Sequence, residues 1–175
     1  MMNINHIKFP ASVISELYQF SLLSREEIIV NQSITGINEI QSAIKTKSSS
    51  LGDNKRNVLI IVNYPDNIHL PDDHRDFLTE ILKACNMGLA DVAILNVNNI
   101  SKASYHELVA FYNSKVVLLF AVEPDAFGLP LSFPHFQIQP FAGVSYLFSP
   151  SLMELKKDNV LKSKLWICLK RMFNL

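Results

Sequence analysis

From residue 58 onward, short apolar runs alternate with segments in which apolar residues recur every three or four positions. The runs are continuous and rich in β-branched residues, as expected of strands that are buried on both faces. Alternation of such strands with helices is typical of a parallel sheet covered on both sides. The pattern predicts an α/β domain, a three-layer sandwich with a four-stranded, mainly parallel sheet. The expected strands are residues 58–62 (VLIIV), 92–97 (VAILNV), 115–122 (KVVLLFAV) and 144–148 (VSYLF).

The helix expected between the first two strands has clear end signals. Asp72 or Asp73 can cap its N-terminus, and Gly88 suits a left-handed residue at its C-terminus. Its apolar positions have helical spacing. They are Phe77, Ile81, Leu82 and Cys85.

Between the second and third strands, Ser101 or Ser104 precedes another helical pattern. A brief helical turn at residues 124–127 follows the third strand. The aromatic stretch 130–141 then leads to the fourth strand, and its prolines, such as Pro140, make it irregular or edge-like.

The C-terminal segment predicts a final helix over residues 160–173. Ser149 can cap a preceding helical turn with Pro150 at the first helical position, and Ser151 with Glu154 offers an alternative capping box.

The region before the first strand divides into two parts. Residues 1–41 predict a helical extension, with an amphipathic helix over 10–23 and a short second helix from Ser24. Residues 42–57 are polar and predict an exposed linker, so the α/β domain is expected to span 58–175.

Composition narrows the class of protein. The chain has 175 residues, 49% of them hydrophobic, and 16 basic residues balance 16 acidic ones, so it lacks the strongly basic field of general nucleic-acid binders. Its two cysteines lie in apolar helical patterns, and no signal peptide or membrane-spanning run is recognisable, which predicts a reduced, cytoplasmic protein. The sequence has only five glycines and no phosphate-binding glycine motif, so we expect no nucleotide cofactor.

The charges are uneven along the chain. Residues 154–171 carry a net charge of +4, which balances −4 elsewhere. This basic C-terminal face predicts contact with an acidic partner or a nucleic acid, although a solvated helix surface has the same pattern. The candidate interaction residues are Lys162, Lys164, Lys170, Arg171 and the single tryptophan, Trp166.

Polar residues follow the expected strands at their carboxyl ends, where parallel α/β sheets bind ligands. A cluster of acidic and histidine residues between 66 and 76 has metal-ligand chemistry, but a polar loop and helix cap explain it more simply. The candidate pocket residues are Asn63, Tyr64, Pro65, Asp66, Asn96, Ser149 and Pro150.

The order LIIV-NYPD, NMGLADVAILN, KVVLLFAV and YLFSPSL resembles the uracil-DNA glycosylase superfamily over roughly residues 57–173. The resemblance implies that Asn63 or Asp66 positions water, that Asn96 reads the base and that Tyr64 stacks on it. Pro65 matches the family loop, but Val62 stands in place of its glycine and Tyr64 in place of one branch's catalytic aspartate. The histidine expected beside Ser149 is absent, so a donor that would stabilise the departing base anion is missing.

The segment 149–169 (SPSLMELKKDNVLKSKLWICL) is similar to the C-terminal segment of the DNA polymerase III psi subunit. That family has the glycosylase-like fold without the glycosylase active site, and it links the clamp loader to a partner that binds single-strand-binding protein. The resemblance implies a non-enzymatic interaction subunit of the DNA replication or repair machinery. A divergent glycosylase, or a binder of nucleic-acid bases, is the alternative hypothesis. The matching residues are Ser149, Pro150, Leu152, Leu155, Leu165 and Trp166.

Overall fold

A computed structural model gives the structure of this chain and describes residues 50–100 and 104–175. The predicted N-terminal extension, with its helices at 10–23 and from Ser24, lies outside the described residues. The first part of the expected linker, up to residue 49, lies outside them as well.

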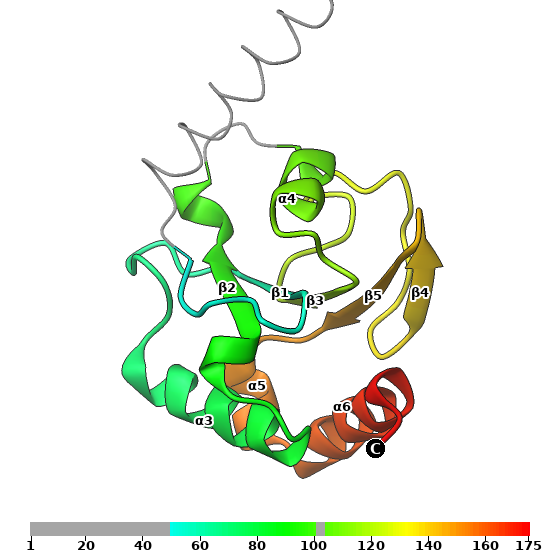
Figure 1. Ribbon diagram of the computed structural model, residues 1–175. Coiled ribbons are helices and arrows are strands. Elements are labelled where there is room, and N and C mark those ends of the chain that lie inside the picture. Colours follow the sequence, from blue (N-terminus) through cyan, green and yellow to red (C-terminus); the bar gives the residue numbers. More distant parts are fainter. Residues whose placement is uncertain (1–49, 101–103) are drawn as a thin grey trace, which may run out of the picture. The chain divides into compact units, whose positions relative to one another are not determined.

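A five-stranded sheet in the order β2-β1-β3-β5-β4 forms the centre of the domain (Figure 1). Neighbouring strands run parallel except β4, which is antiparallel to β5. The α/β class and the positions of the expected strands are confirmed, but the expectation of four strands is wrong. The strands are β1 (Val58–Val62), β2 (Val92–Asn96), β3 (Val116–Phe120), β4 (Ile138–Phe141) and β5 (Val144–Ser149).

The extra strand, β4, forms a hairpin with β5. Ala142 and Gly143 connect the two strands, and both have positive φ angles, 49° and 77°, as a two-residue hairpin turn of type I′ requires. Pro140 has no N–H to donate, which a strand tolerates at the edge of a sheet. The expected edge-like character of this stretch is therefore correct, whereas its pairing with β5 was not predicted.

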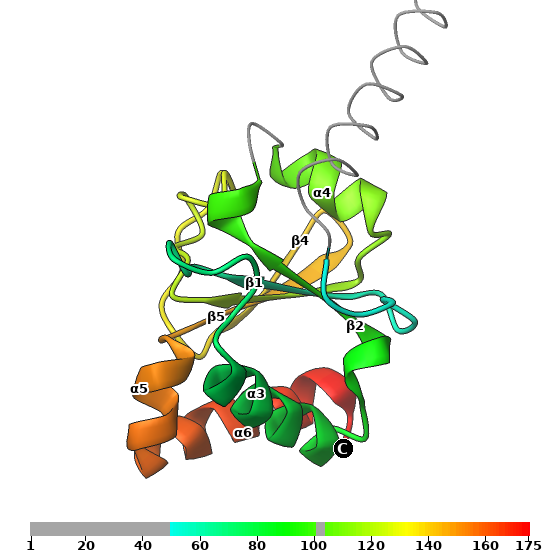
Figure 2. The same cartoon turned by 90° about the vertical axis from the view of Figure 1, so that its left-hand side faces the viewer.

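Helices cover both faces of the sheet (Figures 1 and 2). On one face lie α3 (Asp72–Ala84), α5 (Leu152–Lys157) and α6 (Asn159–Phe173), and on the other lies α4 (Tyr105–Phe111). Within the described residues, no helix has the length and apolar content needed to span a membrane. The part of the chain that the structure describes also contains the short 3₁₀ helices η2 (Leu89–Asp91) and η3 (Val97–Asn99).

The alternation of side chains along the strands divides the core into two apolar layers. In β1, Val58, Ile60 and Val62 belong to the layer shared with α3, α5 and α6, whereas Leu59 and Ile61 belong to the layer shared with α4. All five residues are at most 2% exposed. Burial on both faces explains why β1 is apolar throughout.

The ends of α3 differ from the prediction. Pro71 is the residue at the N-cap and no side chain caps the helix, while Asp72 lies within its first turn. At the other end, Asn86 adopts the left-handed conformation with φ 56°, whereas Gly88 is extended with φ −120°. Asparagine tolerates this conformation better than most residues, so it serves in place of the expected glycine.

For the helices α4 and α5, the sequence offers two N-cap residues each, and the structure uses one of the two. Ser104 caps α4 in a reciprocal capping box with Glu107. Ser151, not Ser149, caps α5 in the same way with Glu154. Ser149 is instead the last residue of β5 and only 1% exposed, so its place in the sheet prevents it from capping a helix.

Residues 50–57, expected to be the end of an exposed linker, are in contact with the domain. Leu51 forms an antiparallel bridge with Ile94 of β2, with both backbone hydrogen bonds at 2.9–3.0 Å. Gly52 has φ 99°, and a Cβ atom there would lie 2.3 Å from the carbonyl oxygens of Leu89 and Val92. The folded domain therefore begins before β1, and this part of the linker prediction is corrected.

Candidate functional site

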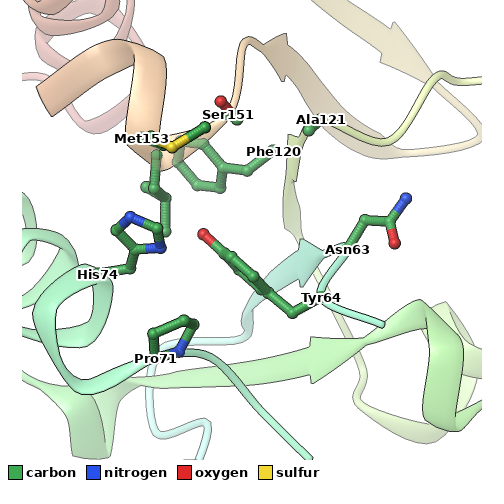
Figure 3. Close-up of a pocket in the computed structure, with 9 residues that line it drawn as sticks. Asn63, Tyr64, Pro71, His74, Phe120, Ala121, Ser151 and Met153 are labelled. Carbon is green, nitrogen blue, oxygen red and sulfur yellow. The ribbon is translucent and has the colours of Figure 1, made fainter. Parts of the chain in front are cut away.

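A cavity of about 310 Å³ lies where the chain leaves β1 and β3 (Figure 3). The connection from β1 leads to β2 on one side, and β3 lies on the other side, so the cavity occupies the topological switch point of the sheet. Parallel α/β sheets bind their ligands at such points. The cavity is lined by Asn63, Tyr64, Pro71, His74, Phe120, Ala121, Ser151, Leu152 and Met153.

Tyr64 and His74 give this cavity its polar groups. The phenol of Tyr64 points toward the space between His74, Phe120 and Met153, and its ring centroid lies 5.4 Å from that of His74 (Figure 3). Burial raises the pKa of Tyr64 from 10.0 to about 12, so the hydroxyl is neutral at physiological pH. The Nδ1 atom of His74 is buried and has no hydrogen-bond partner among residues 50–100 and 104–175. Both groups can therefore exchange hydrogen bonds with a neutral ligand.

Asn96, the predicted base reader, holds the loop after β1 in place. It is 2% exposed, and its Nδ2 donates to the carbonyl oxygens of Tyr64 at 2.6 Å and Asn67 at 2.7 Å. Its Oδ1 accepts from the N–H of Tyr64 at 3.1 Å. Because both N–H donors are engaged and Asn96 does not line the cavity, base reading by this side chain requires the loop to open.

The structure separates the other candidate pocket residues. Asn63 lines the cavity, but its side chain turns away and its Oδ1 accepts from Asn98 at 2.6 Å (Figure 3). Pro65 and Asp66 are exposed in the following loop and do not line the cavity. Ser149 and Pro150 do not line it either. Of the seven predicted residues, only Asn63 and Tyr64 belong to the cavity.

Most of the remaining lining residues were not foreseen. His74 drew notice only as part of an acidic and histidine-rich cluster, and Ser151 only as a cap. Phe120 belongs to an expected strand, and nothing in the sequence marks it as a lining residue. Within residues 50–100 and 104–175, no three His, Cys, Asp or Glu side chains converge on a metal site.

The lining of the cavity combines aromatic rings with polar groups. The rings are those of Tyr64, His74 and Phe120. Of the two residues that the glycosylase resemblance implies as water positioners, Asn63 lines the cavity with its side chain turned away, and Asp66 is exposed outside it. The geometry suits a small, neutral, ring-containing ligand.

A second candidate site is the C-terminal helix. Within α6 the exposed positions include Val160, Lys164, Ile167 and Arg171, which are spaced by four, three and four residues and so share one helix face. We call these four residues the outer face of α6. Val160 is 62% exposed and Ile167 is 63% exposed. Neither Lys164 nor Arg171 forms a salt bridge within the described part of the chain.

Trp166 lies at the edge of the core. Its ring is half-buried, packs against the apolar layer of α3, α5 and α6, and lines a groove between α3 and α6. Lys170 places its Nζ 5.8 Å from the ring centroid. Trp166 is thus both packed and accessible, so it remains a candidate for binding.

Comparison with protein-family models finds none that matches this chain, and no curated protein sequence matches it significantly.

Proposed function

We propose that this protein is a non-catalytic interaction subunit of the DNA replication or repair machinery, with a role similar to that of the polymerase III psi subunit. Its four parallel strands between helical layers suit the uracil-DNA glycosylase-like fold that the sequence resemblance implies, with β4 as an added edge strand. The outer face of α6 carries the proposal, because it exposes apolar and basic side chains together.

The residues that resemble the psi subunit support this face from within. Leu152 and Leu155 of α5 are fully buried, and Leu165 of α6 is 2% exposed. Asp158 joins the two helices and caps α6, accepting from the N–H groups of Val160 and Leu161. The shared residues therefore fix α6 on the domain and leave its outer face free to contact a partner.

The charge of this face indicates the kind of partner. Within Asn159–Phe173 there are three lysines and one arginine and no acidic residue. Isolated exposed apolar residues are common on surfaces, but Val160 and Ile167 lie on the same face as unpaired cations. An acidic protein surface with an apolar centre complements this arrangement.

The organisation of the first loop also favours a non-catalytic role. Asn96 uses both of its donors to hold the loop, and Asp66 lies outside the cavity. The histidine of the glycosylase pattern is absent from the sequence. A glycosylase would lack the donor that the family pattern places after the last strand to stabilise the departing base.

Recovery of the tagged full-length chain from the cells that naturally produce it tests the proposal. Ile167→Glu places a charge in the outer face, and Ile68→Glu is a matched control because Ile68 is 75% exposed on the loop after β1. We expect clamp-loader or single-strand-binding proteins with the wild type and the control, and their loss with Ile167→Glu. Equal recovery by the wild type and both variants, or recovery of no replication protein with any of them, argues against the proposal.

The cavity at the switch point supports a second candidate, a binder of nucleic-acid bases. Its rings, Tyr64, His74 and Phe120, can pack against a flipped base, and single-stranded substrates spare the cost of flipping. This candidate predicts that the wild type binds uracil-containing single strands and that Tyr64→Ala weakens this binding. Neither effect is expected if the chain only binds proteins.

A further inference from the structure

The surface between α3 and α6 contains an apolar groove of about 210 Å³. The two helices lie side by side on the same face of the sheet (Figure 2). Within the groove, Ala84 is exposed, whereas Leu165 and Leu169 form its floor and are at most 2% exposed. Its lining residues, which we call the α3–α6 groove, are Glu80, Ile81, Ala84, Lys162, Leu165, Trp166 and Leu169.

The size of the groove selects the class of ligand. Sites for drug-sized molecules and cofactors occupy roughly 300–1,000 Å³ and enclose most of the ligand. A groove of about 210 Å³ between two helices is smaller than this range, and it has space for one or two apolar side chains. Helix grooves of this kind receive the apolar side chains of peptides.

Two lysines stand on the α6 side of the groove. The Lys162 Nζ lies 6.0 Å from the ring centroid of Phe77, and the Lys170 Nζ lies 5.8 Å from that of Trp166. They are eight residues apart on α6, or about 12 Å along the helix axis. Neither forms a salt bridge with any described residue. The α6 rim therefore presents two unpaired positive charges beside an apolar floor.

The opposite rim argues against a nucleic acid as the ligand. Glu80 of α3 is the acidic residue of the groove lining and faces the α6 side across the groove. A phosphate backbone carries a charge at every nucleotide and would meet Glu80, whereas a peptide can place its carboxylates on the α6 side alone. Lys170 also lies over the Trp166 ring, the only aromatic ring in the groove lining, and so hinders base stacking.

We propose that the α3–α6 groove binds an acidic peptide segment of a partner protein. One or two apolar side chains of the segment enter the groove beside Trp166, and its carboxylates pair with Lys162 and Lys170. The inference rests on the proposed function in that the chain acts by binding proteins, but it concerns a surface distinct from the outer face of α6.

Selection from a phage-displayed library of random dodecapeptides, with the full-length chain as bait, tests the groove. We expect selected peptides to combine Asp or Glu with Phe, Leu, Met or Trp. Binding of a synthetic selected peptide should change the fluorescence of Trp166, the single tryptophan. Selection of no sequence above the unselected library, or of basic sequences, overturns the proposal.

Three variants locate the binding. Ala84→Glu places a bulky acidic group in the groove, and Lys170→Glu reverses a charge on its rim. Each substitution should lower the affinity for the selected peptide by at least about tenfold. Lys164→Glu makes the same charge reversal on the outer face of α6 and should leave peptide affinity within about twofold. Circular dichroism melting curves confirm that each variant is folded. Unchanged affinity in folded Ala84→Glu protein refutes the groove as the site.

Two comparisons separate this proposal from its alternatives. A thymidine oligonucleotide should not displace the peptide, and efficient displacement assigns the groove to nucleic acid instead. The Ile167→Glu variant should still bind the peptide, but it should no longer bind the partner of the outer face of α6. If Ile167→Glu loses its partner but no peptide binds the groove, the groove proposal fails and the proposed function stands.

Discussion

Replacement of Asn96 by alanine tests directly whether this residue holds the loop after β1. Its side chain makes three hydrogen bonds to the backbone of Tyr64 and Asn67, at 2.6–3.1 Å. At about 1 kcal/mol of net stability for each bond, Asn96→Ala should lower the free energy of unfolding by about 3 kcal/mol. A residue kept only to read a ligand would not stabilise the free protein in this way.

The measurement is equilibrium unfolding in urea, monitored by far-ultraviolet circular dichroism and by the fluorescence of Trp166. With a slope of about 1.5 kcal/mol/M, the expected loss moves the midpoint by about 2 M. Asn63→Ala is the matched control, because the Asn63 side chain is exposed and accepts one hydrogen bond from Asn98. Its expected effect is below about 0.5 kcal/mol.

Replacement by aspartate adds a pH dependence with a defined sign. In Asn96→Asp, a carboxyl oxygen takes the place of the Nδ2 that donates to the carbonyl oxygens of Tyr64 and Asn67. Repulsion and burial then raise the carboxyl pKa in the folded state, so stability is lost as the pH rises above the unfolded value of about 4. Equal midpoints for Asn96→Ala, Asn96→Asp and wild type at neutral pH would refute the conclusion that Asn96 holds the loop after β1.

Three further predictions concern the loops and caps. Gly52→Ala should destabilise the domain more than Gly143→Ala in thermal melts, because both residues have positive φ but only at Gly52 would the added Cβ collide with two carbonyl oxygens. Equal effects contradict the contact of residues 50–57 with the domain. Ser151→Ala should lower the free energy of unfolding by about 1 kcal/mol at neutral pH, and it should raise the pKa of Glu154, which hydrogen bonds from Ser151 lower. Because a depressed carboxyl pKa stabilises the folded state only above the unfolded pKa, the difference from wild type should shrink in urea melts at acid pH. Tyr64→Phe should remove one phenol that titrates near pH 12 from the ultraviolet absorbance titration, and loss of a phenol that titrates near pH 10 argues against burial of Tyr64. Because burial raises the pKa of Tyr64, the wild type should lose stability relative to Tyr64→Phe as the pH rises from 10 to 12.

Strands that are buried on both faces were predictable from the sequence, and the partly exposed edge strand was not. β1 and β2 are entirely buried, and their sequences are apolar throughout except for Asn96 at the end of β2. β4 is partly exposed along its whole length and contains Gln139 and Pro140, so its pattern resembles a loop. Its pairing depends on the hairpin turn at Ala142 and Gly143, where alanine gives no turn signal.

The candidate site was predictable in place but not in composition. The rule that ligands bind at the carboxyl ends of strands directs attention to the loop of Asn63 and Tyr64, and both residues line the cavity. The role of Asn96 depends on hydrogen bonds to a loop about 30 residues away, which no local pattern encodes. His74 and Ser151 likewise reach the cavity from two helices far apart in sequence, so only the packing of α3 and α5 brings them together.

Binding of the purified full-length chain to the purified clamp loader and single-strand-binding protein of the same organism tests the proposed function most directly. Titration calorimetry should show a saturable complex with at least one of them. The complex should be lost with Ile167→Glu and retained with Ile68→Glu. A chain that binds neither protein, or binds equally well after both substitutions, contradicts the assignment of a replication partner to the outer face of α6.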